Sequence, residues 1–192
     1  MNVNLIKIGN YKTMKNNNKV FIATSLDGYI ADKNGGIEWL HSIPNPDHND
    51  MGYEEFISQI DALIMGRTTF ETVCGFDMEW PYEKPVFVLS NSLTDLPEEY
   101  TGKVEIVNGD LTEIIKKINN KGYYKLYIDG GKTIQSFLKA DLIDEITLTT
   151  IPYLLGGGTS LFAELPDRME FECVTTNLFL GKIVQNKFVR KR

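Results

Sequence analysis

Cysteine is scarce in this chain, and long apolar runs are missing. The 192 residues hold two cysteines, Cys74 and Cys173, which lie far apart and match no metal-binding or redox spacing. This excludes a disulfide-stabilised scaffold and predicts reduced thiols. No apolar run approaches the roughly 20 residues that a membrane-spanning helix needs. Asparagine and lysine interrupt every apolar stretch before Val20, so no signal peptide is expected. We therefore expect a cytoplasmic protein with no membrane partner.

Basic residues are also too few for a nucleic-acid-binding protein. The chain has 20 Lys and Arg against 26 Asp and Glu, a formal net charge of −6. No basic excess is left to displace counterions from phosphates. The basic end, Arg190-Lys191-Arg192, is too short to alter this and is interpreted as a solvated tail. No cluster of His, Cys and carboxylates indicates a metal site, so neither a nucleic-acid partner nor a metal is expected.

The length and the ordinary composition indicate one globular domain with a short appendage. Hydrophobic residues make up 42% of the chain and charged residues 24%, which is typical of a packed domain of this size. Residues 1–18 are rich in Asn and Lys and are interpreted as an N-terminal extension. Residues 19–192 are interpreted as a single domain.

Short apolar runs alternate with segments of helical periodicity from Val20 onward. This alternation predicts an α/β fold with a mostly parallel central sheet and helices on both faces. Two further strand-like segments joined by Leu180-Gly181 predict an antiparallel C-terminal hairpin. The predicted strands are 20–24, 62–65, 86–89, 104–107, 126–128, 144–151, 171–179 and 182–190, and the predicted helices are 51–60, 68–73, 111–118 and 133–140.

Three predicted strands end in polar or glycine-containing segments: Gly66-Arg67-Thr68-Thr69, Ser90-Asn91-Ser92 and Gly130-Gly131-Lys132-Thr133. In α/β sheets, ligands bind beyond the carboxyl ends of the strands, where glycine lets backbone amides approach a phosphate at a helix N-terminus. Arg67 and the Ser90–Ser92 segment offer guanidinium, hydroxyl and amide donors for a phosphate. Taken singly, each glycine is equally well explained by turn geometry. Together, the three segments favour a phosphate-binding site.

Three segments carry a family resemblance: Ser25-Leu26-Asp27-Gly28-Tyr29-Ile30-Ala31, Met65-Gly66-Arg67-Thr68-Thr69-Phe70-Glu71, and 144–159, which runs through Pro152 into Gly156-Gly157-Gly158. In this order and spacing they resemble the dihydrofolate reductase-like superfamily. Within it they are most similar to the reductase domain of the bifunctional riboflavin-biosynthesis deaminase/reductase. The resemblance covers Lys19 to Arg190. It implies a dihydrofolate reductase-like fold and a reductase that stands alone, because the zinc-binding deaminase motif is absent from the sequence.

The resemblance also implies NADPH as the cofactor and assigns residues to it. The 2′-phosphate would lie at Arg67 and Ser90–Ser92, beside the Gly66 turn with Thr68 and Thr69. The pyrophosphate would lie over Gly130-Gly131-Lys132-Thr133-Ile134, and the nicotinamide against Ala23 and Ile30. Trp39 stands where the family often has a tryptophan near cofactor or substrate, although a core tryptophan is nearly as well supported. Asp27 is interpreted as a turn-forming aspartate.

Two aspartates are candidates for the carboxyl group that binds substrate and takes part in proton transfer. Counting back from Gly66, as the dihydrofolate reductase resemblance suggests, gives Asp50, which can equally be a helix cap or a solvated loop residue. Tyr53 and Phe56, one turn further, would wall a flat heterocycle. The pyrimidine-reductase branch has an acidic residue before its second glycine junction, and Asp129 stands at that place. Asp129 is therefore the preferred candidate.

The leading functional hypothesis is an NADPH-dependent oxidoreductase that transfers a hydride to a small pterin-like or pyrimidine-like heterocycle. One alternative is the riboflavin-pathway enzyme itself, 5-amino-6-(5-phosphoribosylamino)uracil reductase, although no Arg/Lys cluster is evident for its phosphate. Another is a non-catalytic module that binds NADPH or a flavin. We also expect a homodimer, since apolar residues occur near a predicted sheet edge and exposed edges are usually paired or covered.

Overall fold

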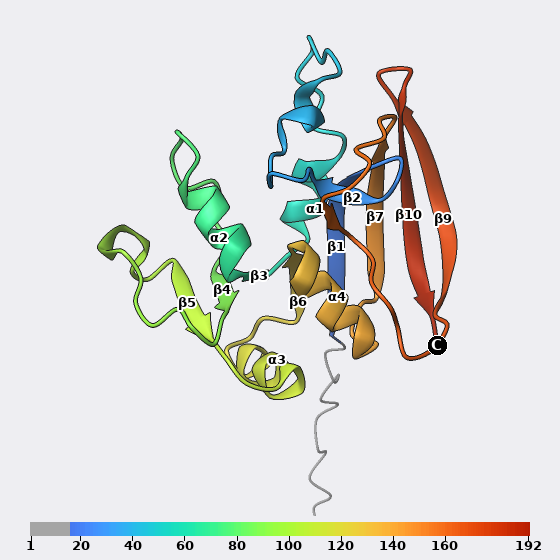
Figure 1. The fold of residues 1–192 in the computed structure, drawn as a ribbon. Coiled ribbons are helices and arrows are strands. Elements are labelled where there is room, and N and C mark those ends of the chain that lie inside the picture. The colour runs from blue at the N-terminus through green and yellow to red at the C-terminus, as the bar shows by residue number, and fades with distance from the viewer. Residues whose placement is uncertain (1–15) are drawn as a thin grey trace, which may run out of the picture.

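A computed structural model describes residues 16–192 of the chain (Figure 1). An α-helix precedes each of β3, β4, β6 and β7, and the last strands follow one another with no helix between them. The strands are β1 (Asn17–Ser25), β2 (Tyr29–Ala31), β3 (Ala62–Gly66), β4 (Val86–Leu89), β5 (Val104–Val107), β6 (Lys125–Asp129), β7 (Glu145–Ile151), β8 (Thr159–Ser160), β9 (Glu170–Phe179) and β10 (Ile183–Lys191). The α-helices are α1 (Tyr53–Ser58), α2 (Arg67–Cys74), α3 (Leu111–Asn120) and α4 (Gly131–Lys139), with 3₁₀ turns at Glu38–His41 and Glu98–Tyr100.

Eight strands form one sheet in the order β5-β4-β3-β6-β1-β7-β10-β9. The pairs from β5 to β7 are all parallel, whereas β10 is antiparallel to both β7 and β9. The apolar runs of β3, β4 and β6 are buried on both faces, as a covered parallel strand requires. The structure confirms the predicted α/β fold with a mostly parallel central sheet.

Helices cover both faces of this sheet, and the side-chain alternation of β3 shows how. Ala62 and Ile64 belong to a core cluster that includes side chains of α3 and α4. Leu63 and Met65 point the other way, into a second cluster with Phe56 of α1 and Phe70 of α2. Because successive residues of a strand face opposite sides, one buried tetrapeptide anchors both layers. The predicted covering of both faces is confirmed.

The antiparallel C-terminal hairpin is also confirmed. Phe179 pairs with Ile183, so the connection has three residues, one more than the predicted Leu180-Gly181. Leu180 and Gly181 have φ angles of 52° and 65°, in the left-handed region. The backbone amide of Lys182 closes the turn by donating to the carbonyl of Phe179 at 3.0 Å. In Figure 1 this hairpin stands at the edge of the sheet, next to β7.

The N-terminal boundary needs a correction. The sheet begins at Asn17, so the last residues assigned to the extension belong to the domain. Asn18 is buried: its backbone amide donates to Asp144 and its side-chain amide to the carbonyl of Leu142. The polar residues at the start of β1 gave no strand signal in the sequence. In the structure the loop before β7 provides acceptors for the two amides of Asn18. The rest of the predicted extension, residues 1–15, lies outside the described residues.

Two short strands were not predicted. β2 and β8 pair antiparallel as a separate two-stranded sheet, too short to leave a periodic pattern in the sequence. Asp27 connects this region to the glycine loop: its carboxylate accepts hydrogen bonds from Ser25 Oγ at 2.6 Å and from the amides of Leu155 and Gly156 at 3.1 and 2.8 Å. Asp27 thus has the turn-forming role expected of it.

No helix between residues 16 and 192 is long and apolar enough to cross a membrane.

The exposed sheet edge at β9 leads us to propose a homodimer. Within residues 16–192, β9 pairs with β10 alone, and its outer edge has no partner strand along its ten residues. Val174 and Leu178 of β9 are 48% and 65% exposed, a combination that a second copy would cover. We expect light scattering to give twice the chain mass of 21.8 kDa. Leu178→Lys should shift the protein to monomer, while Asn120→Lys on the exposed end of α3 should not. A mass of one chain for the wild type at micromolar concentration would contradict the proposal.

Candidate functional site

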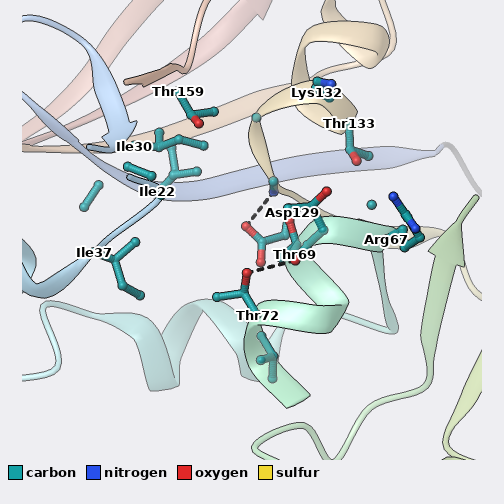
Figure 2. A pocket seen from close by; sticks show the side chains of 18 of the residues that line it. Ile22, Ile30, Ile37, Arg67, Thr69, Thr72, Asp129, Lys132, Thr133 and Thr159 are labelled. Atoms are coloured by element: carbon teal, nitrogen blue, oxygen red, sulfur yellow. Dashed lines mark hydrogen bonds between the residues drawn. The ribbon is translucent and has the colours of Figure 1, made fainter. Parts of the chain in front are cut away.

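A cavity of about 790 Å³ opens at the carboxyl ends of β1, β3 and β6, where α2 and α4 begin. Figure 2 shows Ile22, Ile30 and Ile37 on one side of Asp129 and Arg67 on the other. Most of the residues predicted to bind a cofactor, together with the preferred acid, line this one cavity: Ala23, Ile30, Gly66, Arg67, Thr68, Thr69, Asp129, Gly130, Gly131, Lys132 and Thr133. Ile134 is buried in the core one residue beyond the lining.

The two glycine junctions interlock. β3 and β6 are adjacent, with Met65 paired to Asp129, so Gly66 and Gly130 follow at the same level. A Cβ atom on Gly66 would lie 2.9 Å from Thr133 Oγ1, and one on Gly130 would overlap the hydroxyl of Thr69. Each glycine therefore makes room for a threonine of the opposite helix, and the two helix starts are held next to each other.

Neither of these helix starts is capped by a side chain. Gly66 and Gly130 occupy the N-cap positions, so α2 and α4 have no side-chain acceptor for their first amides. Free first-turn amides and the positive end of the helix dipole form an anion site. Arg67 and Lys132 add two cations to the cavity lining. This donor set fits the pyrophosphate and the 2′-phosphate of a dinucleotide.

The predicted phosphate site at Arg67 and Ser90 is assembled only in part. Gly66 pairs with Leu89, so Arg67 and Ser90 leave neighbouring strands at the same level. The Ser90 oxygen already accepts the amides of Ser92 and Leu93, at 3.2 and 3.0 Å, and holds the turn. Arg67 is half-exposed and pairs with Glu71 at 3.6 Å. Asn91 and Ser92 are exposed and do not line the cavity.

The apolar side of the cavity contains Ala23 and Ile30, as predicted, but Trp39 lies elsewhere. Gly131 packs against Ile30: a Cβ atom on Gly131 would lie 2.9 Å from Ile30 Cδ1. Trp39 packs in a third core cluster with Ile43, Ile151 and Ile183, and its indole Nε1 is buried without a hydrogen-bond partner. The core interpretation of Trp39 therefore describes its surroundings better than a contact with cofactor.

Asp129 is the acid that the fold places in the cavity. It ends β6 half-buried, and its Oδ1 accepts the amide of Gly130 at 2.8 Å. Burial raises the pKa of this carboxyl from 3.8 to about 6, against the opposing effects of the Gly130 amide and the Tyr127 hydroxyl. Tyr127, two residues earlier, donates to the carbonyl of Phe21 at 2.9 Å. A carboxyl with this pKa is protonated in part of the molecules near neutral pH.

Asp50 lies outside the cavity, and the structure gives it a different role. Its exposed carboxylate accepts the amides of Gly52 and Glu54, at 3.0 and 2.7 Å, at the start of α1. These bonds lower its pKa. Tyr53 and Phe56 are not in the lining either: they pack on Phe21 in an aromatic core cluster. Counting back from Gly66 leads to the turn at the start of α1. There the Asp50 carboxylate accepts backbone amides, as a helix-capping residue does.

Some lining residues were missed by the sequence reasoning. Phe21 and Tyr127 lie in apolar strands and looked like core, and Tyr82 lies in an irregular connection. The spacing of Tyr127 and Asp129 would place both side chains on one face of β6 and was an available signal. No signal of comparable strength marks Tyr82. Among residues 16–192, no group of three or more His, Cys, Asp or Glu side chains is placed to hold a metal.

The glycine interlock gives a stability prediction. Gly130→Ala should unfold at clearly lower urea concentration, because its backbone has φ +87° and the new methyl group would overlap Thr69. Gly122→Ala is the matched control, since Gly122 has φ +95° but nothing within 4 Å of a Cβ atom. The control should cost about 1 kcal/mol of unfolding free energy, and Gly130→Ala about 2 kcal/mol more. Adding Thr69→Ala should recover part of the loss; equal losses at the two glycines would contradict the interlock.

The raised pKa of Asp129 gives a second prediction. Its ionisation is disfavoured in the folded protein, so its contribution to stability is complete below pH 3.8 and is lost as the pH rises through about 6. Asp129→Asn should match the wild type near pH 3.8 and become more stable above pH 6, by about 2–3 kcal/mol. Urea unfolding across this range measures the difference. Asp50→Asn is a control of opposite sign, since its lowered pKa predicts a loss at neutral pH that shrinks in acid. A pH-independent effect at Asp129 would refute this electrostatic account.

Two relatives match nearly the whole of this chain. A solved protein from Shewanella sp. PV-4, provisionally assigned to riboflavin biosynthesis, is 52% identical, with a TM-score of 0.90, over 92% of this chain and 99% of its own. The uncharacterized protein YwjB of Bacillus subtilis is 32% identical over 179 residues, which cover 92% of this chain and 99% of YwjB.

More distant structures share the fold. The Thermotoga maritima diaminohydroxyphosphoribosylaminopyrimidine deaminase/5-amino-6-(5-phosphoribosylamino)uracil reductase matches at 15% identity and a TM-score of 0.68, over 92% of this chain and 57% of its own. Dihydrofolate reductase from Enterococcus faecalis matches at 17% identity and a TM-score of 0.62, over 92% of this chain and 97% of its own. The fold is therefore dihydrofolate reductase-like. The RibD C-terminal domain model matches residues 19–184, and the chain belongs to the RibD C-terminal domain family.

Proposed function

We propose that this protein is an NADPH-dependent reductase that acts on a small pterin-like or pyrimidine-like heterocycle. Membership of the RibD C-terminal domain family supports an oxidoreductase. The observation that carries the finer proposal is the meeting of two uncapped helix N-termini and one buried carboxyl in a single cavity. The first feature suits a dinucleotide and the second suits a substrate that must be protonated.

The cofactor would be held by the backbone at the two junctions and by two cations. The first turn of α4, from Gly130 to Ile134, offers amides and the Lys132 ammonium to the pyrophosphate. Arg67, at the start of α2, is placed for the 2′-phosphate. Ala23 and Ile30 supply an apolar surface for the nicotinamide ring. NADPH supplies the hydride when bound, and the protein must orient it and keep water away.

Asp129 would supply the proton. Its Oδ1 accepts the Gly130 amide, and Oδ2 would hold a proton or accept an N–H of the substrate. Because burial raises its pKa to about 6, a protonated carboxyl is available near neutral pH. Reduction of a C=N bond then takes the hydride on carbon and the Asp129 proton on nitrogen. Water reprotonates the carboxylate afterwards.

Family membership favours a second candidate, the reduction of 5-amino-6-(5-phosphoribosylamino)uracil. That reaction is named for the Thermotoga maritima protein, whose likeness to this chain is one of fold. Complementation of a riboflavin auxotroph that lacks this reductase separates the candidates. Growth without riboflavin would support the second one.

The NADPH proposal predicts a selective effect of Arg67. Arg67→Ala should weaken NADPH binding about tenfold or more, because a charge-assisted hydrogen bond to the 2′-phosphate is lost. Binding of NADH, which lacks this phosphate, should change by less than about threefold. Nicotinamide fluorescence titration measures both. Lys116→Ala, an exposed cation of α3 away from the cavity, is the control and should leave both affinities unchanged.

Two results would count against the proposal. Equal losses of NADPH and NADH in Arg67→Ala would show that Arg67 has a structural role. No binding of NADPH to the wild type at millimolar concentration would refute the cofactor assignment.

A further inference from the structure

The connection between α2 and β4, residues 75–85, supplies aromatic side chains to the cavity. Phe76 and Tyr82 both line it, although the connection has no regular secondary structure. Phe76 is 39% exposed at the rim, whereas Tyr82 is half-buried. Neither side chain has a part in the proposed cofactor contacts. Tyr82 therefore needs an explanation of its own.

Ring packing holds Tyr82 in place. Its ring meets Trp80 edge-on, with centroids 5.2 Å apart. Trp80 packs in turn on Phe70 of α2 at 6.0 Å and on Tyr100 at 5.0 Å. The Trp80 indole Nε1 is buried and has no hydrogen-bond partner in the part of the chain that the structure describes, where ring packing positions this residue. The packed ring of Trp80 thus holds Tyr82, two residues later, at the cavity.

Tyr82 and Asp129 line the same cavity. Burial and the charge of Asp129 both raise the pKa of the Tyr82 phenol, burial more strongly. The phenol therefore stays protonated at neutral pH and can donate a hydrogen bond. Tyr127 and Phe21 are further aromatic members of the lining. The surroundings of Asp129 thus offer flat apolar rings and neutral hydroxyl groups.

Positive charge is confined to the helix starts. Arg67 and Lys132 are the cations that line the cavity within residues 16–192, and each begins or follows the first residue of a helix. In Figure 2 Arg67 lies well to one side of Asp129. In the proposed complex the cofactor phosphates use Arg67, Lys132 and the helix-start amides, so a second phosphate carried by the substrate would find no further lining cation within residues 16–192 and would be repelled by the Asp129 carboxylate. A neutral planar ring with N–H donors has complementary partners in Asp129 and Tyr82.

We propose that Tyr82 is the aromatic wall of the substrate position and that it selects a planar, phosphate-free nitrogen heterocycle whose ring N–H groups donate to Asp129. This assignment rests on the proposed reductase function and names its substrate class. It identifies a specificity-determining residue in a connection that the family motifs do not include. It also disfavours the phosphoribosylated pyrimidine as the substrate.

A matched pair of probes tests this proposal. 6-Hydroxymethylpterin and its phosphate monoester share one ring and differ in the phosphate alone, and 5,6-diaminouracil serves as a pyrimidine probe. Calorimetric titration into protein saturated with NADP⁺ should show the alcohol binding at least about tenfold more tightly than the ester. Tyr82→Ala should weaken the alcohol about tenfold, the size expected for loss of ring stacking. Tyr82→Phe, which keeps the ring, should retain binding within about threefold.

Controls separate specificity from folding. Tyr124→Ala removes an equally half-buried tyrosine at the opposite end of β6 and should change neither probe. NADPH affinity, measured by fluorescence, should be the same within about twofold in Tyr82→Ala and the wild type. If NADPH does not bind the wild type, the proposed function fails. If NADPH binds, three results each overturn the present inference: no binding of either heterocycle, equal or tighter binding of the ester, or no effect of Tyr82→Ala.

Discussion

The interlock between the two strand–helix junctions is the constraint on which the rest of the site depends. Gly66 and Gly130 end adjacent strands, and each leaves the space that a threonine of the opposite helix occupies. A side chain at either position would push α2 and α4 apart. Because there is none, two uncapped helix N-termini share one cavity. The anion site is thus built from backbone amides, and its geometry follows from the sheet register rather than from any flexible side chain.

The same interlock sets the electrostatics of Asp129. Asp129 directly precedes Gly130, so the position of the β6–α4 junction also fixes the position of the carboxyl. Phe21, Tyr82 and Tyr127 line the same cavity. Burial raises the pKa of the carboxyl, and the Gly130 amide and the Tyr127 hydroxyl offset only part of that rise. Cation-bearing helix starts and an aromatic, proton-holding position therefore occupy two regions of one cavity. A reductase needs such a division between cofactor and substrate.

The sequence predicted the regular elements well, because a buried parallel strand is a short apolar run between turn residues. The strands 86–89 and 104–107 agree to the residue, and the glycine junctions were found for the same reason. Asp50 and Trp39 were placed less well. Both lie in the long segment between β2 and α1, where sequence spacing does not determine which way a side chain points. In the structure Asp50 accepts local backbone amides and Trp39 packs in the core. Tyr82 was missed because its position depends on ring contacts with Trp80, itself packed on the distant Tyr100.

The two regions of the cavity also differ in how the fold specifies them. The helix starts come from β3, β6, α2 and α4, elements that any chain with this sheet order must have. The aromatic wall comes from an irregular connection in which ring packing positions Tyr82, and such segments vary more freely than the elements they join. Fold likeness at 15–17% identity therefore carries information about the first region and little about the second. Substrate choice in this chain has to be read from the residues around Asp129, where the aromatic rings favour an uncharged ring and residues 16–192 add no lining cation beyond Arg67 and Lys132.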